Sequence, residues 1–252
     1  VRYFYSRVDG ALFVGDSNFQ YHRHYGLPLD RLFPGVLPID RKRLIGAMTD
    51  REAVRRELRR ELGIPDDAFV LMFCGKYVPH KRPLDLVAAA WKVAKNGLPV
   101  WSLLVGDGPE RGVIESFCKQ EGVANSTLTG FVNQSKIAHY YAASDAVAVA
   151  SSEDAHPLVV SEGAAFGLPV IISDRVGCIG ATDSARAGVN AVIYPCGDRE
   201  RLERAIETLY LDKDLYGKMS AASVTISESQ DVTVAARTLA DATAALKEMG
   251  PR

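Results

Sequence analysis

Several features that would assign this chain to a specialised class of protein are absent. No uninterrupted apolar run approaches the ~18 residues that a transmembrane helix needs. The 30 basic and 31 acidic side chains nearly cancel, which argues against nucleic acid as a partner. Repeats and low-complexity segments are also missing. The remaining class is a globular chain of 252 residues, enough for one large domain or two small ones.

Cysteine is scarce and widely spaced. The four cysteines, Cys74, Cys118, Cys178 and Cys196, contain no C-x-x-C pair. This spacing predicts buried thiols in a reducing compartment rather than disulfides or zinc ligands. No cluster of histidines and carboxylates suggests another metal site. We therefore expect a cytoplasmic protein without a metal or other cofactor.

From residue 69 onward, strand-like and helix-like segments alternate. The first strand, Phe69–Cys74, is apolar throughout, as in a strand buried on both faces. The alternation predicts an α/β fold with a doubly wound parallel sheet and helices on both faces. Such sheets bind ligands in the loops at the carboxyl ends of their strands. Further strands are expected at 100–105, 127–129, 146–150, 170–172 and 191–194, and helices at 86–93, 109–120, 135–143, 158–166 and 199–209.

The beginning and the end of the chain are organised differently. We expect a strand at 11–15, a helix capped by Ser17 and ending at His24, and a linker over 33–50. A charged amphipathic helix is expected at 51–62 and an alanine-rich helix at 232–249. The predicted units are 1–38, the last strand and helix of a preceding domain; 39–66, linker and connecting helix; 67–228, a Rossmann-like domain; and 229–252, a C-terminal helix.

The segment from Asp154 to Val170 carries the clearest chemical signal. Asp154 and Glu162 lie eight positions apart, around a loop that enters a helix, and the helix ends at Gly167. The start of a helix attracts anions through its unpaired amides and its dipole. A carboxylate one turn inside the helix suits hydroxyl groups instead. A phosphate together with neighbouring hydroxyls describes a nucleotide.

Three motifs in this order resemble family 4 retaining glycosyltransferases. They are Cys74-Gly75-Lys76 followed by Lys81, then Gly106-Asp107-Gly108-Pro109, then the 154–170 segment. The resemblance covers residues 10–245 and implies the GT-B fold, in which two Rossmann-like domains face a cleft. It implies that the donor, a nucleotide sugar, binds chiefly to the C-terminal domain and the acceptor to the N-terminal one. The chain would then hold the end of the N-terminal acceptor domain and all of the donor domain.

The resemblance also implies roles for charged residues. Glu162 would bind the ribose hydroxyls. Asp154 would contact the donor sugar, although the family usually has Glu there, and Glu153 is the alternative one residue away. Lys76 and Lys81 would hold the diphosphate and offset the charge that develops on it as the leaving group. Each of these has an alternative interpretation as an ordinary surface charge.

The remaining candidates are backbone or packing positions. His156-Pro157 stand where the family often has Phe-Gly, and Pro157 lacks an amide hydrogen. The amides of Leu158 and Val159 remain for phosphate or sugar oxygens, and the backbone at Phe131 and Val132 would read the base. Alternatively, Phe131 belongs to the core and His156 only packs. The candidates for donor binding are Gly75, Gly106, Phe131, Val132, His156, Leu158, Val159 and Glu162; the candidates for catalysis are Lys76, Lys81 and Asp154.

The expected activity is transfer of a sugar from a nucleoside diphosphate to a glycan or lipid-linked acceptor, with retention of configuration. A sugar-nucleotide epimerase of the same fold and a binding domain inactive without its partner domain are the alternatives. Peripheral membrane association of the full-length protein stays open. A nicotinamide-dependent oxidoreductase is disfavoured because Gly75-Lys76-Tyr77-Val78-Pro79 is not G-x-G-x-x-G. The D-x-D at Asp212-Lys213-Asp214 is interpreted as a chance match rather than a metal motif.

Overall fold

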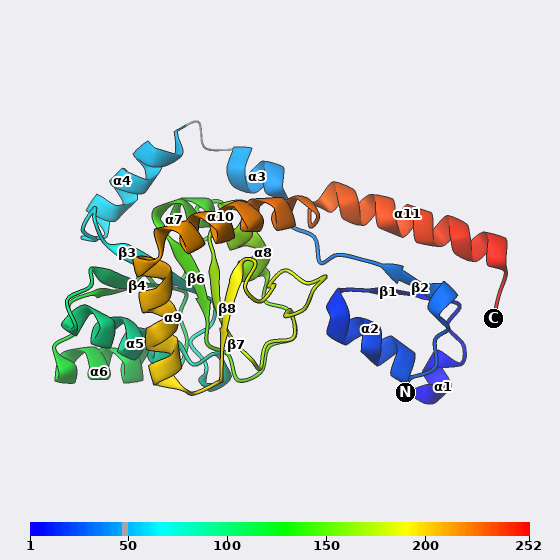
Figure 1. The fold of residues 1–252 in the computed structure, drawn as a ribbon, viewed down its shortest axis with the longest axis horizontal. Coiled ribbons are helices and arrows are strands. Elements are labelled where there is room, and N and C mark those ends of the chain that lie inside the picture. Colours follow the sequence, from blue (N-terminus) through cyan, green and yellow to red (C-terminus); the bar gives the residue numbers. More distant parts are fainter. Residues whose placement is uncertain (47–49) are drawn as a thin grey trace.

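The computed structural model describes residues 1–46 and 50–252. The chain forms a large α/β body and a smaller lobe beside it, and both termini lie at the lobe (Figure 1). Residues 47–49, part of the predicted linker, lie outside the described residues.

Six parallel strands form the sheet of the large body, in the order β5-β4-β3-β6-β7-β8. The chain enters at β3, winds to one edge, and returns to β6 to wind to the other edge. The order therefore reverses between β3 and β6, where doubly wound sheets open a crevice for ligands. The strands are β3 (Phe69–Cys74), β4 (Val100–Val105), β5 (Ser126–Leu128), β6 (Ala146–Val149), β7 (Val170–Ser173) and β8 (Ala191–Tyr194).

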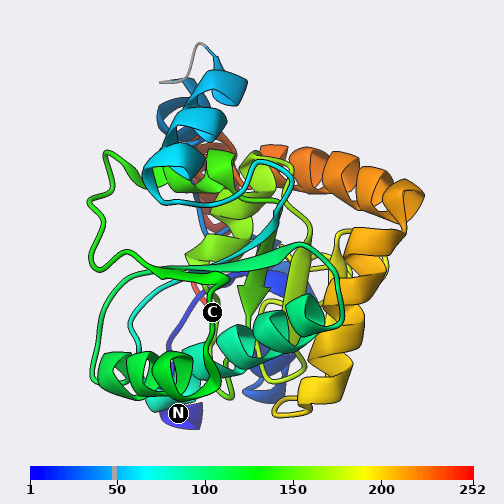
Figure 2. The same ribbon diagram turned by 90° about the vertical axis from the view of Figure 1, so that its left-hand side faces the viewer.

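Helices cover both faces of this sheet, as Figure 2 shows. Alternate side chains of β3 enter opposite cores: Val70 and Met72 pack on one side, Leu71 and Phe73 on the other. This two-sided burial explains why β3 is apolar throughout. One face packs against α5 (Pro83–Lys95), α6 (Arg111–Glu121) and α9 (Arg199–Leu211), and the other against α4 (Arg51–Glu61), α7 (Ile137–Ala143) and α8 (Leu158–Ala165).

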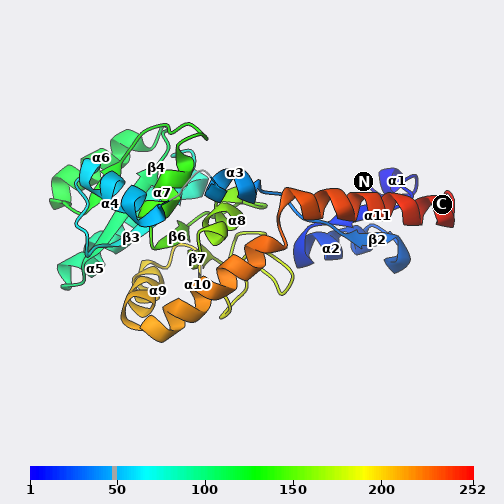
Figure 3. The same cartoon turned by 90° about the horizontal axis from the view of Figure 1, so that it is seen from above.

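The smaller lobe joins the two ends of the chain. Helix α11 (Val232–Met249) runs along the first 34 residues, as seen from above in Figure 3. Arg31 donates to the carbonyl of Gly250 at 3.1 Å, and Arg252 donates to the carbonyls of Tyr5 and Gly26 at 3.2 and 2.8 Å. The other elements are α1 (Arg2–Tyr5), β1 (Ala11–Phe13), α2 (Gly15–His24), η1 (Leu29–Arg31) and β2 (Leu32–Pro34), with β1 and β2 parallel.

The chain passes between the body and the lobe twice, and the two passages are paired. The N–H of Ile39 donates to the carbonyl of Gln230 at 3.0 Å, and that of Val232 donates to the carbonyl of Ile39 at 3.1 Å. Next to these passages lie α3 (Arg41–Gly46) and α10 (Lys213–Glu228). The remaining short element, η2 (Pro79–Lys81), precedes α5 in the body. The lobe is thus joined to the body by two hydrogen-bonded segments.

The structure corrects several sequence predictions. The predicted linker over 33–50 contains most of β2 and all of α3. Ser17 does not cap α2, which begins at Gly15, and Asn18 Oδ1 accepts the N–H of Val14 at 2.9 Å. Ser135 does not cap α7 either, since Asn133 binds both its amide and its hydroxyl. Helices α1 and α10 were not expected as such, and β1-α2-β2 is a complete βαβ unit rather than a last strand and helix.

Two predictions about special residues are tested directly. All four cysteines are free thiols, but only Cys178 is buried and the others are half-buried. Asp212 accepts the N–H of Leu215 at 2.9 Å, so the D-x-D sequence serves as a helix cap. In the described ranges, no helix combines the length and the apolar character needed to cross a bilayer.

Candidate functional site

Lys81 and Asp154 meet at the crevice between β3 and β6. Lys81 Nζ forms an ion pair with Asp154 Oδ2, and their side chains are 26% and 12% exposed. The N–H of Ser152 donates to the carbonyl of His80 at 2.8 Å, which ties the loop after β6 to the loop after β3. The structure therefore brings together two of the three candidates for catalysis. Glu153, the alternative to Asp154, is exposed on the same loop.

Helix α8 begins immediately after this ion pair. Pro157 stands at its N-cap position, and the N–H groups of Leu158 and Val159 have no partner among the residues that the structure describes. The carbonyl of Asp154 accepts the N–H of Gly177 at 2.8 Å, which holds the loop before the helix in place. Two unpaired amides, the helix dipole and Lys81 together make this corner suitable for an anion.

Glu162 lies in the second turn of α8 and faces the end of β3. Its Oε2 accepts a hydrogen bond of 2.6 Å from the hydroxyl of buried Tyr141. Burial raises the pKa of Glu162, while the Tyr141 hydrogen bond and the charge of Arg43 act in the opposite direction. Burial and the charge of Glu162 raise the pKa of the Cys74 thiol to about 12. Tyr141 thus orients a half-buried carboxylate beside an uncharged thiol.

A pocket of about 420 Å³ opens between the ends of β3 and β4. We call it the β3–β4 pocket. Phe131 is 82% exposed at this pocket, so the interpretation that it belongs to the core is wrong. Lys76 is exposed at its rim. The lining residues are Cys74, Gly75, Lys76, Val105, Gly106, Asp107, Phe131, Val132 and Ile137, which include five of the predicted site residues.

Gly106 has a structural reason to be glycine. Its φ is +138°, and a Cβ added to it would lie 1.9 Å from the carbonyl oxygen of Gly75. Its N–H donates to the carbonyl of Gly130 at 3.0 Å, and the N–H of Gly75 donates to the carbonyl of Val105 at 2.9 Å. Only a residue without a side chain allows the loops after β3, β4 and β5 to approach this closely.

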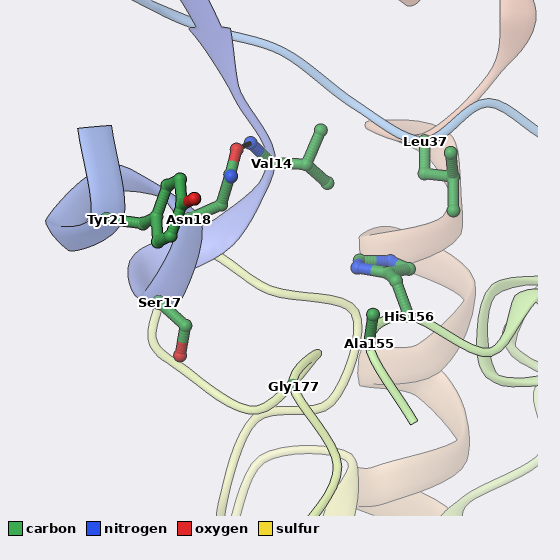
Figure 4. A pocket seen from close by; sticks show the side chains of 8 residues that line it. All are labelled: Val14, Ser17, Asn18, Tyr21, Leu37, Ala155, His156 and Gly177. Carbon is green, nitrogen blue, oxygen red and sulfur yellow. Dashed lines mark hydrogen bonds between the residues drawn. The ribbon is translucent and has the colours of Figure 1, made fainter. Parts of the chain in front are cut away.

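A second pocket of about 420 Å³ lies between the smaller lobe and the large body. In Figure 4, His156 projects into this interlobe pocket between Val14 and Leu37. Its Nε2 lies 3.2 Å from Ser184 Oγ, and burial lowers the pKa of His156 despite the opposing effect of Asp154. The interlobe pocket is lined by Val14, Ser17, Asn18, Tyr21, Leu37, Ala155, His156 and Gly177.

The sequence predicted only His156 among these lining residues. Ser17, Asn18 and Tyr21 lie on α2, far from the donor motifs in the sequence. The local signal for these residues is the polar start of α2, which equally predicts a helix cap. His156 therefore faces the interlobe pocket. The other candidates for donor binding line the β3–β4 pocket or lie on α8.

Asp16 connects the lobe to the body beside the interlobe pocket. Its carboxylate accepts the N–H of Ala181 at 2.8 Å and the hydroxyl of Thr182 at 2.6 Å. Its own N–H donates to Asp183 Oδ2 at 2.9 Å. Three hydrogen bonds thus hold the start of α2 against the loop after β7. Over the described residues, no group of His, Cys, Asp and Glu side chains has an arrangement that would hold a metal ion.

Residues 54–224 match the model of the family described as Glycosyl transferases group 1. The chain belongs to this family. The match covers more than half of the chain and includes the loops after β3, β4 and β6 that build the candidate site.

Curated relatives are similar over the same region. A lipopolysaccharide core biosynthesis glycosyltransferase, LpsD of Rhizobium meliloti, is 32% identical over 164 residues, which cover 65% of this chain and 45% of that protein. A D-inositol 3-phosphate glycosyltransferase of Thermobispora bispora is 31% identical over 184 residues, covering 69% of this chain and 42% of that protein. The matched region therefore spans less than half the length of these relatives.

Solved structures share the fold. Anabaena Alr3699/HepE in complex with UDP has a TM-score of 0.78 at 20% identity, covering 94% of this chain and 64% of that chain. Sucrose-phosphate synthase from Thermosynechococcus elongatus has a TM-score of 0.76 at 20% identity, covering 99% of this chain and 61% of that chain. The α/β, Rossmann-like fold of the GT-B type, predicted from the sequence, is confirmed.

Proposed function

We propose that this chain carries the donor-binding part of a glycosyltransferase that uses a nucleoside diphosphate sugar and retains the configuration of the transferred sugar. The observation that carries the proposal is the Lys81–Asp154 ion pair at the start of α8, where the strand order reverses. A cation, two unpaired amides and a carboxylate meet there, and these groups suit a diphosphate with a sugar attached. The UDP bound in the similar Anabaena structure supports the same class of ligand.

In the proposed complex, each part of the donor has its own contacts. The base enters the β3–β4 pocket, against the backbone of Phe131 and Val132. Glu162 accepts hydrogen bonds from the ribose hydroxyls, and Asp154 contacts the sugar. Lys76, Lys81 and the amides of Leu158 and Val159 hold the diphosphate. These lysines and amides supply positive charge at the leaving group, so the proposal invokes no metal ion.

The proposed reaction exchanges one bond at the anomeric carbon for another. The bond from that carbon to the diphosphate oxygen breaks, and a bond from an acceptor hydroxyl oxygen forms on the same face. The hydroxyl proton passes to the departing diphosphate, whose developing charge Lys76 and Lys81 offset. The interlobe pocket, with His156 on its wall, lies beside Asp154 and offers the acceptor a route to this face.

The acceptor is proposed to be a glycan or a lipid-linked sugar, and residues 1–38 to be the end of the acceptor domain. The relatives named for lipopolysaccharide core biosynthesis and for D-inositol 3-phosphate support an acceptor of hydroxylated character. The proposed location is the cytoplasm, with the full-length protein at a membrane surface when its acceptor is lipid-linked. The named relatives are transferases, so the epimerase alternative is not favoured.

A calorimetric titration tests this proposal. The chain is titrated side by side with the diphosphates of uridine, guanosine and adenosine. Saturable binding of one of them, weakened by the Glu162→Ala substitution, is the expected result and identifies the donor class. If none binds to this chain or to a longer polypeptide that contains it, the proposal is wrong.

A further inference from the structure

Arg82 has an unusual backbone conformation directly after Lys81. Its φ and ψ are 51° and 47°, and it is the one non-glycine residue with a positive φ in the ranges that the structure describes. The left-handed conformation is disfavoured for any residue with a Cβ. Such a conformation persists where the surrounding structure holds it, commonly at functional sites.

The Arg82 side chain pairs with Asp85 and not with Asp154. Its Nε donates to Asp85 Oδ2 at 2.6 Å, and the Asp85 side chain is only 8% exposed. Arg199, the first residue of α9, lies 3.4 Å from the other oxygen of Asp85. The guanidinium group of Arg82 also lies beside Gly197, in the loop before α9. Arg82 and Asp85 together therefore connect the start of α5 to the start of α9 and to the loop before it.

The backbone of Arg82 joins the turn that carries Lys81 to helix α5. Its N–H donates to the carbonyl of Pro79 at 3.2 Å, and its carbonyl accepts the N–H of Asp85 at 3.1 Å. The φ and ψ of this single residue therefore set the direction of the η2 turn relative to α5, which follows it. Lys81 is the last residue of that turn, and its amine reaches Asp154.

We propose that Arg82 is a positioning residue for Lys81: its ion pair with buried Asp85 holds the left-handed turn that directs Lys81 toward Asp154 and the diphosphate. This inference rests on the proposed function, because it assigns Lys81 to the diphosphate. A charge-assisted hydrogen bond to a buried carboxylate is strong enough to offset the disfavoured backbone. Arg82 itself contacts no part of the proposed donor.

Two substitutions at Arg82 separate the backbone from the side chain. Arg82→Gly removes the ion pair with Asp85 but adopts the left-handed conformation without steric cost. Arg82→Ala removes the same ion pair and keeps the steric cost. Both variants should unfold at a lower temperature, but only Arg82→Ala should lose affinity for the nucleoside diphosphate that the unsubstituted chain binds, by about tenfold. Arg201→Ala, which removes an exposed arginine on α9, is the control for loss of one positive charge nearby and should keep full affinity.

The loss of nucleotide affinity in Arg82→Ala should also depend on the presence of Lys81. With Lys81→Met already in place, Arg82→Ala should cause no further loss of nucleotide affinity. Equal losses in Arg82→Gly and Arg82→Ala, no loss in Arg82→Ala, or the same loss with and without Lys81 would each overturn the positioning role. Titration with uridine, guanosine and adenosine diphosphates also reports on the proposed function, which fails if neither the unsubstituted chain nor a longer polypeptide that contains it binds any of them.

Crystal structures of the two variants test the inference without any nucleotide. The expected result is that the Lys81–Asp154 ion pair persists in Arg82→Gly and is broken in Arg82→Ala. If the ion pair persists in both variants, Arg82 does not position Lys81, even if the proposed function holds. If it is broken in Arg82→Ala alone, the positioning of Lys81 beside Asp154 is supported even if the nucleotide titration fails.

Discussion

At the scale of single residues, Glu162 shows how burial and one hydrogen bond control a candidate ligand. Burial raises its pKa above the ordinary value of 4.5, and the hydrogen bond from Tyr141 limits that rise. Ionising Glu162 in the nucleotide-free protein therefore costs free energy. Its contribution to stability is fully present below pH 4.5 and is lost as the pH rises through the raised pKa. Ribose hydroxyls that donate to the carboxylate would offset this cost.

Nucleotide affinity should therefore depend on pH through Glu162. The ionised carboxylate accepts two hydrogen bonds, so affinity should fall as the pH is lowered through the raised pKa, beginning above 4.5. Tyr141→Phe removes the hydrogen bond that lowers this pKa and should move the midpoint upward. Calorimetric titrations over a pH series measure the midpoint. The Glu162→Gln variant is the control for titration of the nucleotide itself and should lack this component.

The loss of Glu162 gives a magnitude for its role. Glu162→Ala should weaken nucleoside diphosphate binding by about 1.5–3 kcal/mol, because hydrogen bonds to a charged group contribute that much. Calorimetry on the folded variant measures the change. Unchanged affinity would remove Glu162 from the site.

Asp154 and Glu153 can be separated by comparing two ligands. Asp154→Ala should weaken binding of the nucleotide sugar by about fivefold or more beyond any change in binding of the bare nucleoside diphosphate, the equivalent of one hydrogen bond. Glu153→Ala is the matched control, because Glu153 is exposed on the same loop, and both affinities should survive it. If Glu153→Ala causes the sugar-specific loss instead, the contact with the sugar belongs to Glu153.

At the scale of elements, α4 is attached to the sheet by a buried charge. Arg59 is 1% exposed and donates to the carbonyls of Ala143 and Ala68, each at 2.9 Å. Its Nη2 lies 2.7 Å from Asp145 Oδ2, which also accepts the N–H of Val70 at 2.7 Å. One arginine thus satisfies carbonyls from two segments, the end of α7 and the approach to β3, and pairs with the carboxylate that binds the start of β3.

Removing this arginine should destabilise the body strongly. Arg59→Met keeps the apolar stem but leaves the buried carbonyls without their donor and Asp145 with Arg55 as its only arginine partner among the described residues, which should cost about 3 kcal/mol of the free energy of unfolding. Urea denaturation measures this cost. Arg56→Met, on the exposed side of the same helix, removes only a 3.9 Å ion pair with Glu52 and should cost less than about 0.5 kcal/mol. Similar costs for both variants would contradict this account of α4.

At the scale of the whole molecule, Asp16 and Asp183 make the contact between lobe and body sensitive to pH. The hydrogen bond from Thr182 lowers the pKa of Asp16, while burial raises the pKa of Asp183. The contribution of Asp16 is present above its ordinary pKa and is lost as the pH falls through the lowered value. That of Asp183 is lost as the pH rises through its raised pKa. The contact should therefore be strongest between these two pKa values.

Loss of Asp16 should loosen the lobe without unfolding the body. In Asp16→Ala, the amide of Ala181 loses its acceptor, and its hydrogen exchange should accelerate by about tenfold, as local opening becomes easier. Exchange measured by mass spectrometry on peptides that contain residues 180–183 reports this change. Asp30→Ala, at an exposed position of the lobe, is the control and should leave the exchange unchanged.

The sequence by itself determined the repeating architecture and the class of chemistry. An apolar run such as Phe69–Cys74 stays buried in any parallel sheet, and the bounds of α11 follow from its cap at Asp231 and its end at Gly250. The spacing of Asp154 and Glu162 places both around the start of one helix, whatever the rest of the fold. These signals act within a few residues, so they survive without tertiary information.

Only the tertiary structure decided which groups meet. Lys81 and Asp154 are 73 positions apart and Asp16 and Asp183 are 167 apart, and both pairs depend on where the strand order and the lobe place their loops. Segments without a period, such as 33–46, take their structure from their neighbours, which is why β2 and α3 were missed. The same holds for the burial of Arg59, whose partners Ala143 and Asp145 are 84 and 86 positions away. The left-handed turn at Arg82 is a state that local preference disfavours, and its nearby partner Asp85 is buried by the tertiary structure.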